Sequence, residues 1–408
     1  MKGIVIISLA ILSSAYAGLK EVAMDFVPSG WVADTAGAVI ADFNADGADD
    51  IALVYYRIDP ERGELSNRVN RVLILLEHEQ GLKRVLDQGL PFDEDFGTEV
   101  MLSWDDGILY IFQHMGFMHR FNEWGLEWDE DQGAFWERTS AWGGLLGLGS
   151  AGGFDAGTGI GYVEKIWGDV DVSAEYSTIY AEKLDGSISF DGEDDEADWN
   201  RPWAADSTWV TFGENKWDGG DDASITVRAL YDSHYLYLFV EVTDDEFVQP
   251  ANADEILKSD HLELWFDRLT VGESEAQDYY PELWNRRKDP YVTQIAVAQT
   301  LDGKSVVRMW LPEDADYEPD IKSGFYREGN RWSAELGIAW VRFGTEGSMD
   351  HLPFTLVFSD SDNPSDPKQE TLIGTSQLQW ADPFTFGSLS TKKPDRIFWG
   401  VYPLPEEK

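Results

Sequence analysis

Short apolar runs alternate with polar, glycine-containing segments along most of this chain. The runs are rich in Val, Ile, Leu, Tyr and Phe, and their length and composition are typical of β-strands. They lie at residues 71–77, 100–103, 108–113, 225–229, 235–242, 261–266, 292–298, 306–311, 332–338 and 354–358. Because no segment shows a sustained helical period, the pattern predicts an all-β protein.

Several of these runs are joined by sequences that favour tight hairpins. Residues 104–107, 301–303 and 328–330 are polar, and each segment contains a glycine that tolerates the backbone angles of a turn. The strands are therefore expected to pair mostly with their neighbours in the sequence.

The first seventeen residues have the pattern of a secretory signal peptide. Lys2 is positive, residues 4–12 are almost all apolar, and Ala15 and Ala17 are small residues at the cleavage positions. The mature chain is expected to begin at Gly18. The apolar run is far shorter than the roughly 20 residues that span a bilayer. We therefore expect a secreted protein, extracellular or periplasmic, without membrane insertion.

Charge and cysteine content narrow the classes of partner. The chain has 76 Asp and Glu against 31 Lys and Arg, a net charge of −45, and no cysteine, so disulfides and thiol-linked lipid anchors are excluded. Such a negative surface repels nucleic acid and anionic lipid. It suits a basic partner, divalent cations or a saline habitat, and the favoured interpretation is that the acidity keeps the protein soluble in salty surroundings.

A change in composition indicates two domains. Residues 143–161 are rich in Gly, Ser and Ala, which is typical of a linker or of a surface loop. We place the boundary near residue 180, which gives a smaller all-β domain at 18–180 and a second domain at 181–408.

One loop in the first domain has the spacing of a calcium site. Oxygen side chains recur at alternate positions, Gly47 permits a sharp turn, and a carbonyl fills the remaining gap, as Ca²⁺ coordination requires. The predicted ligands are Asp42, Asn44, Asp46, Ala48 and Asp50. Leu53 stands where an EF-hand has its glutamate, and residues 38–40 and 51–55 look like strands. The alternative to a structural Ca²⁺ is a solvated acidic turn.

This strand-flanked loop resembles the FG-GAP or VCBS type of repeat. Only a single clear copy is present, and a propeller requires several blades. The residues that follow the loop are similar to a small secreted β-domain often found behind one such loop. The resemblance therefore implies an FG-GAP-like β-domain, with the ion serving to fold the loop.

The second half resembles family 9 carbohydrate-binding modules, over about residues 184–402. The resemblance rests on Phe190-Asp191-Gly192-Glu193 with Trp199, and on the hairpin at 227–245. It continues through the acidic strand at 259–267 and the late strand at 332–338, and ends with Gln379-Trp380-Ala381-Asp382-Pro383. It implies a jelly-roll-like β-sandwich that binds glycan.

The same resemblance implies a sugar site, with part of its pattern changed. The family holds its ligand between two Trp rings. Trp380 matches one, and the other falls near Leu257, whose aliphatic side chain lacks an electron-rich face. Glu263 matches a carboxylate near the site, whereas the family's Arg and Asn fall at Ala296 and Ala298. The rings expected to replace the lost one are Trp265, Trp284 and Tyr291.

The sequence thus predicts a secreted, non-catalytic protein that binds a polysaccharide or oligosaccharide and carries a structural Ca²⁺. We find no catalytic motif, so it would assist a separate glycoside hydrolase in trans. Two alternatives remain. One is an adhesive protein with a cell-surface protein partner and no sugar binding. The other is a haem b-binding electron-transfer domain, because relatives of this sandwich bind haem and Met309 and His351 offer ligands.

Overall fold

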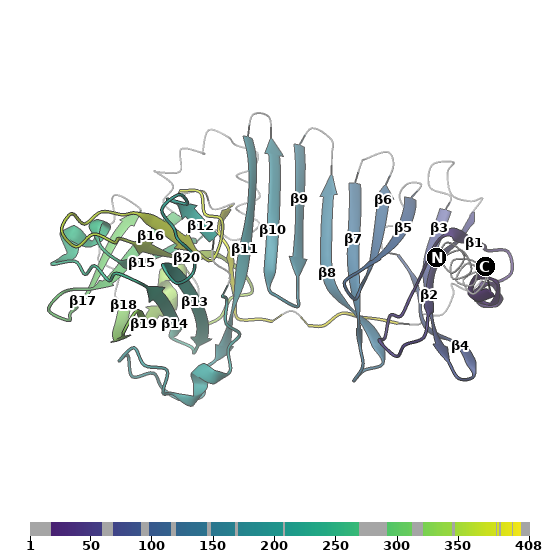
Figure 1. The fold of residues 1–408 in the computed structure, drawn as a ribbon, viewed down its shortest axis with the longest axis horizontal. Helices are drawn as coiled ribbons and strands as arrows, with labels where there is room; N and C mark the ends of the chain where they lie inside the picture. The colour runs from purple at the N-terminus through teal and green to yellow at the C-terminus, as the bar shows by residue number, and fades with distance from the viewer. Residues whose placement is uncertain are drawn as a thin grey trace, which may run out of the picture. The chain divides into compact units, whose positions relative to one another are not determined.

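The computed structural model describes the chain in segments (Figure 1): residues 18–58, 68–90, 98–115, 120–144, 148–167, 170–206, 209–268, 292–311, 321–344, 347–380, 382, 385–393 and 395–400. The signal peptide predicted at 1–17 lies outside them. The chain divides into two compact units. Unit 1 comprises Met1–Thr158, Glu164–Asp171 and Asp395–Lys408, and unit 2 comprises Gly159–Val163 and Val172–Pro394.

Unit 1 contains two antiparallel sheets. The first has the order β1-β2-β3-β4, with β1 at Val32–Ala41, β2 at Asp50–Ile58, β3 at Arg68–His78 and β4 at Gly81–Gly89. The second runs through β5 (Thr98–Asp105), β6 (Ile108–Met115), β7 (Arg120–Asp129), β8 (Ala134–Gly144) and β9 (Leu148–Asp155). The short strand β23 (Phe398–Trp399) returns from near the end of the chain and pairs with β8.

Apolar packing explains why β2 and β3 have continuous apolar runs instead of alternating ones. One face of the β1–β4 sheet contributes Val54, Ile74 and Leu76 to a core shared with Ile111 and Phe135 of the second sheet. The opposite face packs beneath residues 18–31, which include a helical segment at 18–23 and the 3₁₀ helix η1 (Met24–Phe26). Both faces of these strands are therefore removed from water.

The glycine-rich segment at 143–161 is neither a linker nor a loop along most of its length. It forms β9 and, after a turn, the start of β10 (Ile160–Trp167). A side chain at Gly143 would meet the ring of Phe121, its partner on β7, at 2.3 Å. These glycines thus leave room for aromatic rings to lie across the sheet, which composition alone does not reveal.

Unit 2 is a β-sandwich. In its first sheet β11 (Val170–Lys183), β13 (Ala223–Tyr231), β14 (Tyr235–Asp244), β19 (Arg331–Ala339) and β18 (Ile321–Glu328) follow one another. Its second sheet has the order β12 (Trp209–Phe212), β21 (Thr371–Gly374), β20 (Leu352–Asp360), β15 (His261–Asp267), β16 (Val292–Gln299) and β17 (Ser305–Leu311). The strand β22 (Ser388–Ser390) links β11 to β20. Residue 180, the predicted domain boundary, lies within β11.

Every strand predicted from the apolar pattern lies within an observed strand, and the all-β class is confirmed. The predicted hairpin turns join β5 to β6, β16 to β17 and β18 to β19. The helical elements of unit 2 are short 3₁₀ turns: η2 (Ala197–Asn200), η3 (Ala253–Lys258) and η6 (Trp340–Phe343).

Alternation along the strands builds the core of the sandwich. Leu238 and Val240 of β14 face Leu264 of β15 and Leu356 of β20 in one apolar cluster, while Phe239 between them is buried in a second cluster on the other face of the sheet. The central strands β15 and β16 are buried on both faces, because a second aromatic cluster and η3 cover the outer side of their sheet.

The segment before η2 is fixed to the first sheet by one buried carboxylate. Glu335 accepts hydrogen bonds from the Trp199 indole (2.9 Å) and from the backbone N–H groups of Asp191 (2.9 Å) and Gly192 (3.0 Å). Gly192 has a φ of +85°, and a side chain there would meet the backbone of Phe325 at 2.4 Å. Only glycine fits this close approach.

Candidate functional site

Trp380 presents its indole to solvent. It follows β21 in a turn of unit 2, and 52% of its surface is exposed. The ring of Trp265 on β15 lies beneath it, edge to face, with ring centroids 6.1 Å apart and an interplanar angle of 79°. Trp265 also contacts the buried ring of Phe386 at 6.1 Å. An exposed aromatic face is thus supported from below by packed rings, which limits its motion.

Trp265 supports this face and presents none of its own to solvent. The side chain is only 1% exposed, and its Nε1 donates to Oε2 of Glu263 at 2.7 Å. The prediction that Trp265 replaces the missing sugar-stacking ring therefore needs correction. Trp265 is buried because β15 is covered on both faces of its sheet, so that every side chain of this strand is removed from solvent.

Glu263 is a structural neighbour of the exposed ring. It is 3% exposed; its Oε2 also accepts from Nε2 of Gln294 (3.0 Å), and its Oε1 lies 3.2 Å from Nε2 of His261. His261 is in turn held through Nδ1 by the carbonyl of Ser259 at 2.7 Å. This carboxylate is positioned to orient Trp265, and through it Trp380. It is not open to a ligand in solvent.

The remaining predicted residues divide between exposed, buried and undescribed positions. Leu257 lies in η3 and is half exposed, whereas Ala296 and Ala298 of β16 are buried beneath that helix. Trp284 and Tyr291 lie outside the residues that the structure describes. The structure therefore brings Trp380, Trp265 and Glu263 together, and whether a second ring faces Trp380 stays a prediction.

The acidic loop of unit 1 joins β1 to β2 as expected. Oδ1 and Oδ2 of Asp42 accept from the N–H groups of Asp46 (3.1 Å) and Gly47 (2.8 Å), and Oδ1 of Asp46 accepts from Ala48 N–H (2.8 Å). The Ala48 bond lowers the pKa of Asp46. Asn44 also donates to Asp46. The loop is thus a compact turn rich in oxygen atoms.

Asp50, the last residue of this predicted ligand set, is wholly buried. It accepts from the N–H groups of Phe43 (2.9 Å) and Glu77 (2.8 Å). Burial raises the pKa of Asp50 to about 6, partly offset by these two donors. It therefore ties the loop to β3.

A groove of about 440 Å³ lies on the outer side of the sheet formed by β13, β14, β19 and β18. Polar side chains dominate its walls, and Tyr326 supplies an exposed ring. Its lining includes Ser224, Thr226, Glu241, Thr243, Tyr326 and Arg331. The sequence pattern gave no indication of this groove, because its residues come from three separate parts of the chain: the β13–β14 hairpin, the β18–β19 hairpin and the segment at 193–194.

The two candidate haem ligands lie on separate elements of the sandwich: Met309 is on β17, and His351 directly precedes β20. Met309 is on β17 opposite Ile295 and packs against the core, whereas Nδ1 of His351 lies 2.7 Å from the hydroxyl of Ser388. Neither contact points to iron. Among the described residues, no helix has the length and apolarity needed to cross a membrane.

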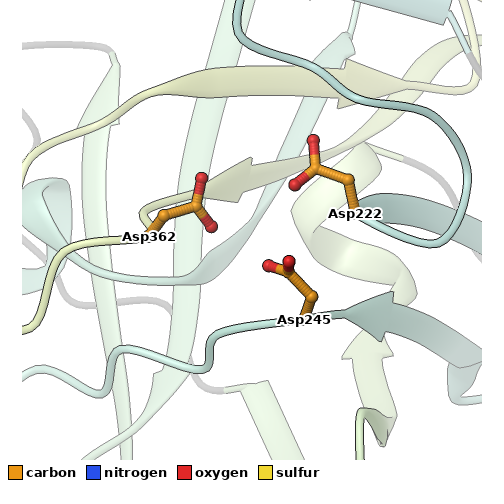
Figure 2. A group of neighbouring side chains, drawn as sticks. All are labelled: Asp222, Asp245 and Asp362. Carbon is orange, nitrogen blue, oxygen red and sulfur yellow. The ribbon is translucent and has the colours of Figure 1, made fainter.

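Six aspartates that were not predicted from the sequence lie at one end of the sandwich. They form two groups that could hold a metal ion: Asp244, Asp260 and Asp360, and Asp222, Asp245 and Asp362, the second of which is shown in Figure 2. The available signal was an acidic residue at the end of each of several predicted strands, with Asp244 and Asp245 adjacent in sequence. Only the fold shows that these strand ends meet.

Comparisons with known proteins agree with the sandwich. The family model described as "Carbohydrate family 9 binding domain-like" matches residues 190–393. No curated protein matches the chain. Two similar solved structures are of a family 9 carbohydrate-binding module from Caldicellulosiruptor kristjanssonii. The cellotriose complex has 16% identity and a TM-score of 0.34, covering 52% of this chain and 93% of that one. The glucose complex has 14% identity and a TM-score of 0.34, covering 54% and 97%. At these values neither likeness carries an argument beyond the family match.

Proposed function

Because the chain belongs to the carbohydrate family 9 binding domain-like family, we propose that it is a secreted, non-catalytic protein that binds a polysaccharide or oligosaccharide through unit 2. The observation that carries this proposal is the exposed indole of Trp380, supported edge to face by the buried ring of Trp265. Its location would be extracellular or periplasmic, and it would bring a separate glycoside hydrolase to its substrate.

The chemistry of stacking supports this assignment of Trp380. An indole carries negative charge on its face, and that face attracts the polarised C–H groups of a pyranose ring while excluding water from the apolar side of the sugar. A ring held in place before binding loses less conformational entropy when the ligand arrives. The hydrogen bond between Trp265 and Glu263 provides this support, because it fixes the ring beneath Trp380.

A glycan array probed with the full mature chain tests the function. Cellotriose and glucose, the ligands named for the two similar structures, belong among the first probes. We expect retention on at least one neutral glycan, both with and without a chelator, and an absorption spectrum without a Soret band. A protein that binds no glycan would instead be the adhesive alternative, with a cell-surface protein partner. A Soret band would favour the haem-binding alternative.

In unit 1 we propose that the loop of Asp42, Asn44, Asp46, Ala48 and Asp50 binds a structural Ca²⁺. The alternating oxygen side chains and the turn at Gly47, whose φ is +89°, support this proposal. The ion would fold the loop of an FG-GAP-like domain.

Calcium titration by calorimetry checks the loop site. Asp46→Ala removes a carboxylate from the loop, and we expect it to bind one Ca²⁺ fewer than the unmodified chain. Asp49→Ala is the matched control, because Asp49 belongs to the same loop but stands outside the ligand spacing. Equal calcium uptake by the unmodified chain and the Asp46→Ala variant would show that the acidic turn is merely solvated.

A further inference from the structure

The groove beside Tyr326 has a floor of polar side chains on the outer face of β13, β14, β19 and β18 (Figure 1). Ile225, Val242 and Trp332 pack into the core of the sandwich, and side chains alternate along a strand, so their neighbours on the same strands face outward. The outward residues stand in two rows that cross the sheet in register. Thr226, Glu241 and Tyr326 lie in one row, and Thr243, Arg331 and Glu328 lie in the next.

Buried hydrogen bonds hold one wall of the groove in place. This wall is the segment at 193–194, which directly follows Gly192. The hydroxyl of Ser333 donates to the Gly192 carbonyl at 2.6 Å, and the buried carboxylate of Glu335 accepts from the Gly192 N–H at 3.0 Å. The groove is therefore formed before a ligand arrives, so binding has to order little of the protein. Its volume of about 440 Å³ is in the range of ligand pockets.

Arg228 lies beside the groove and compensates two of its carboxylates. Its Nη2 donates to Asp194 at 3.2 Å and to Glu241 at 3.1 Å. The charged residues that remain in the lining are two glutamates and one arginine. The groove is thus close to neutral in a chain whose net charge is −45. This balance favours a neutral ligand over a cationic one.

Several side chains on the floor have hydrogen-bonding groups that the protein does not use. Within the described segments, these side chains form neither a hydrogen bond nor an ion pair with another residue: Thr226, Thr243, Tyr326, Glu328 and Arg331. A guanidinium group only donates, a carboxylate only accepts, and a hydroxyl does both. Arg331 and Glu328 stand opposite each other on β19 and β18. A ligand with neighbouring hydroxyl groups can therefore accept from one and donate to the other.

Tyr326 adds an aromatic surface to these polar groups. It is 41% exposed and lies on β18, at the edge of the groove. The face of its ring attracts polarised C–H groups, and its hydroxyl remains free for a hydrogen bond. Pyranose rings combine an apolar C–H face with a rim of hydroxyl groups. The lining therefore matches a neutral sugar chain in both respects.

We propose that the groove beside Tyr326 is a second glycan-binding site, which takes a neutral oligosaccharide independently of Trp380. Trp380 lies against the aromatic cluster on the outer side of the second sheet, whereas the groove is on the outer side of the first. The core between two packed sheets is about 10 Å thick, so a short oligosaccharide occupies one site at a time. Two polysaccharide chains can be held at once, and the protein cross-links them. This inference goes beyond the function proposed above, because it rests on the groove residues alone.

Calorimetry with the full mature chain carrying Trp380→Ala tests the groove by itself. The probes are soluble neutral hexasaccharides of β-linked glucose, xylose and mannose. We expect this chain to bind at least one of them, with one hexasaccharide per chain and more weakly than the unmodified chain does. Adding Tyr326→Ala or Arg331→Met should weaken this binding by about tenfold or more. Trp203→Ala is the matched control, since it removes a ring of similar exposure (43%) outside the groove, and it should leave the binding unchanged.

Cross-linking of a soluble β-glucan, xylan or mannan provides a second measurement. The unmodified chain should increase the light scattering of the polysaccharide whose hexasaccharide it binds. The Trp380→Ala chain and the Tyr326→Ala chain, each with a single site, should not. A Trp380→Ala chain that binds none of the hexasaccharides would overturn the second site, and binding by the unmodified chain would then leave the function proposed through Trp380 in place. Binding that neither Tyr326→Ala nor Arg331→Met weakens would also overturn it.

Discussion

Replacing Trp380 with alanine is expected to weaken glycan binding by about 30-fold or more, which corresponds to about 2 kcal/mol of binding free energy. The ring is the exposed part of an aromatic stack that is supported by the buried ring of Trp265. Retention on the glycan identified by the array, measured by affinity electrophoresis and by calorimetry, gives the result directly. Thermal unfolding should change little, because half of the side chain is already in solvent.

Trp142 provides a matched control for this experiment. It is 52% exposed, the same fraction as Trp380, but it lies on β8 of unit 1. Trp142→Ala should leave glycan binding unchanged. If the Trp380→Ala variant binds as tightly as the unmodified chain, the sugar is held elsewhere, and the groove beside Tyr326 becomes the site to test. A loss in both variants would indicate nonspecific adsorption to exposed aromatic rings.

Replacing Arg71 with methionine is expected to lower the free energy of unfolding of unit 1 by about 3–5 kcal/mol. Arg71 donates through Nε to Oδ1 of Asp87 at 2.8 Å, and both side chains are buried. Asp87 also accepts from the Tyr55 hydroxyl (2.6 Å) and from Arg84 (2.9 Å). Without Arg71, a buried carboxylate loses its most deeply buried positive partner. Chemical denaturation followed by tryptophan fluorescence measures the change.

Arg396→Met is the control for the effect of removing an ion pair in the same unit. Arg396 pairs with Asp129, but more than half of its side chain is exposed, so the loss should be about 0–1 kcal/mol. If Arg71→Met lowers the free energy of unfolding no more than Arg396→Met does, the buried network of Arg71 and Asp87 does not stabilise the fold as we expect. The double variant Arg71→Met with Asp87→Leu should recover part of the lost stability, because it removes the unpaired charge along with its partner.

Local patterns of apolar and polar residues were sufficient to predict many of the strands and three of the hairpin turns. A continuous apolar run marked β3, and an alternating one marked β13, because the apolar pattern of a strand follows its burial on two faces or on one. Polar turns containing glycine marked three hairpins. The strands that were missed have other compositions. Half of the residues of β9 are Gly or Ala, and glycines on the strands before and after it leave space for aromatic rings: Gly143 of β8 for Phe121, and Gly161 of β10 for Tyr176. Composition indicated a linker there because the aromatic partners are distant in sequence.

The sequence by itself determined the all-β class, the family resemblance of the second half and the choice of Trp380 as the candidate sugar-binding ring. These depend on short motifs and on periodicity, which are local properties of the chain. Only the tertiary structure decided that Trp265 is buried beneath Trp380, that Glu263 holds Trp265 in place, and that six aspartates meet at one end of the sandwich. Burial and the meeting of strand ends depend on which strands become neighbours. Pairing between distant segments cannot be predicted from any single stretch of residues, because it depends on contacts that the whole fold creates.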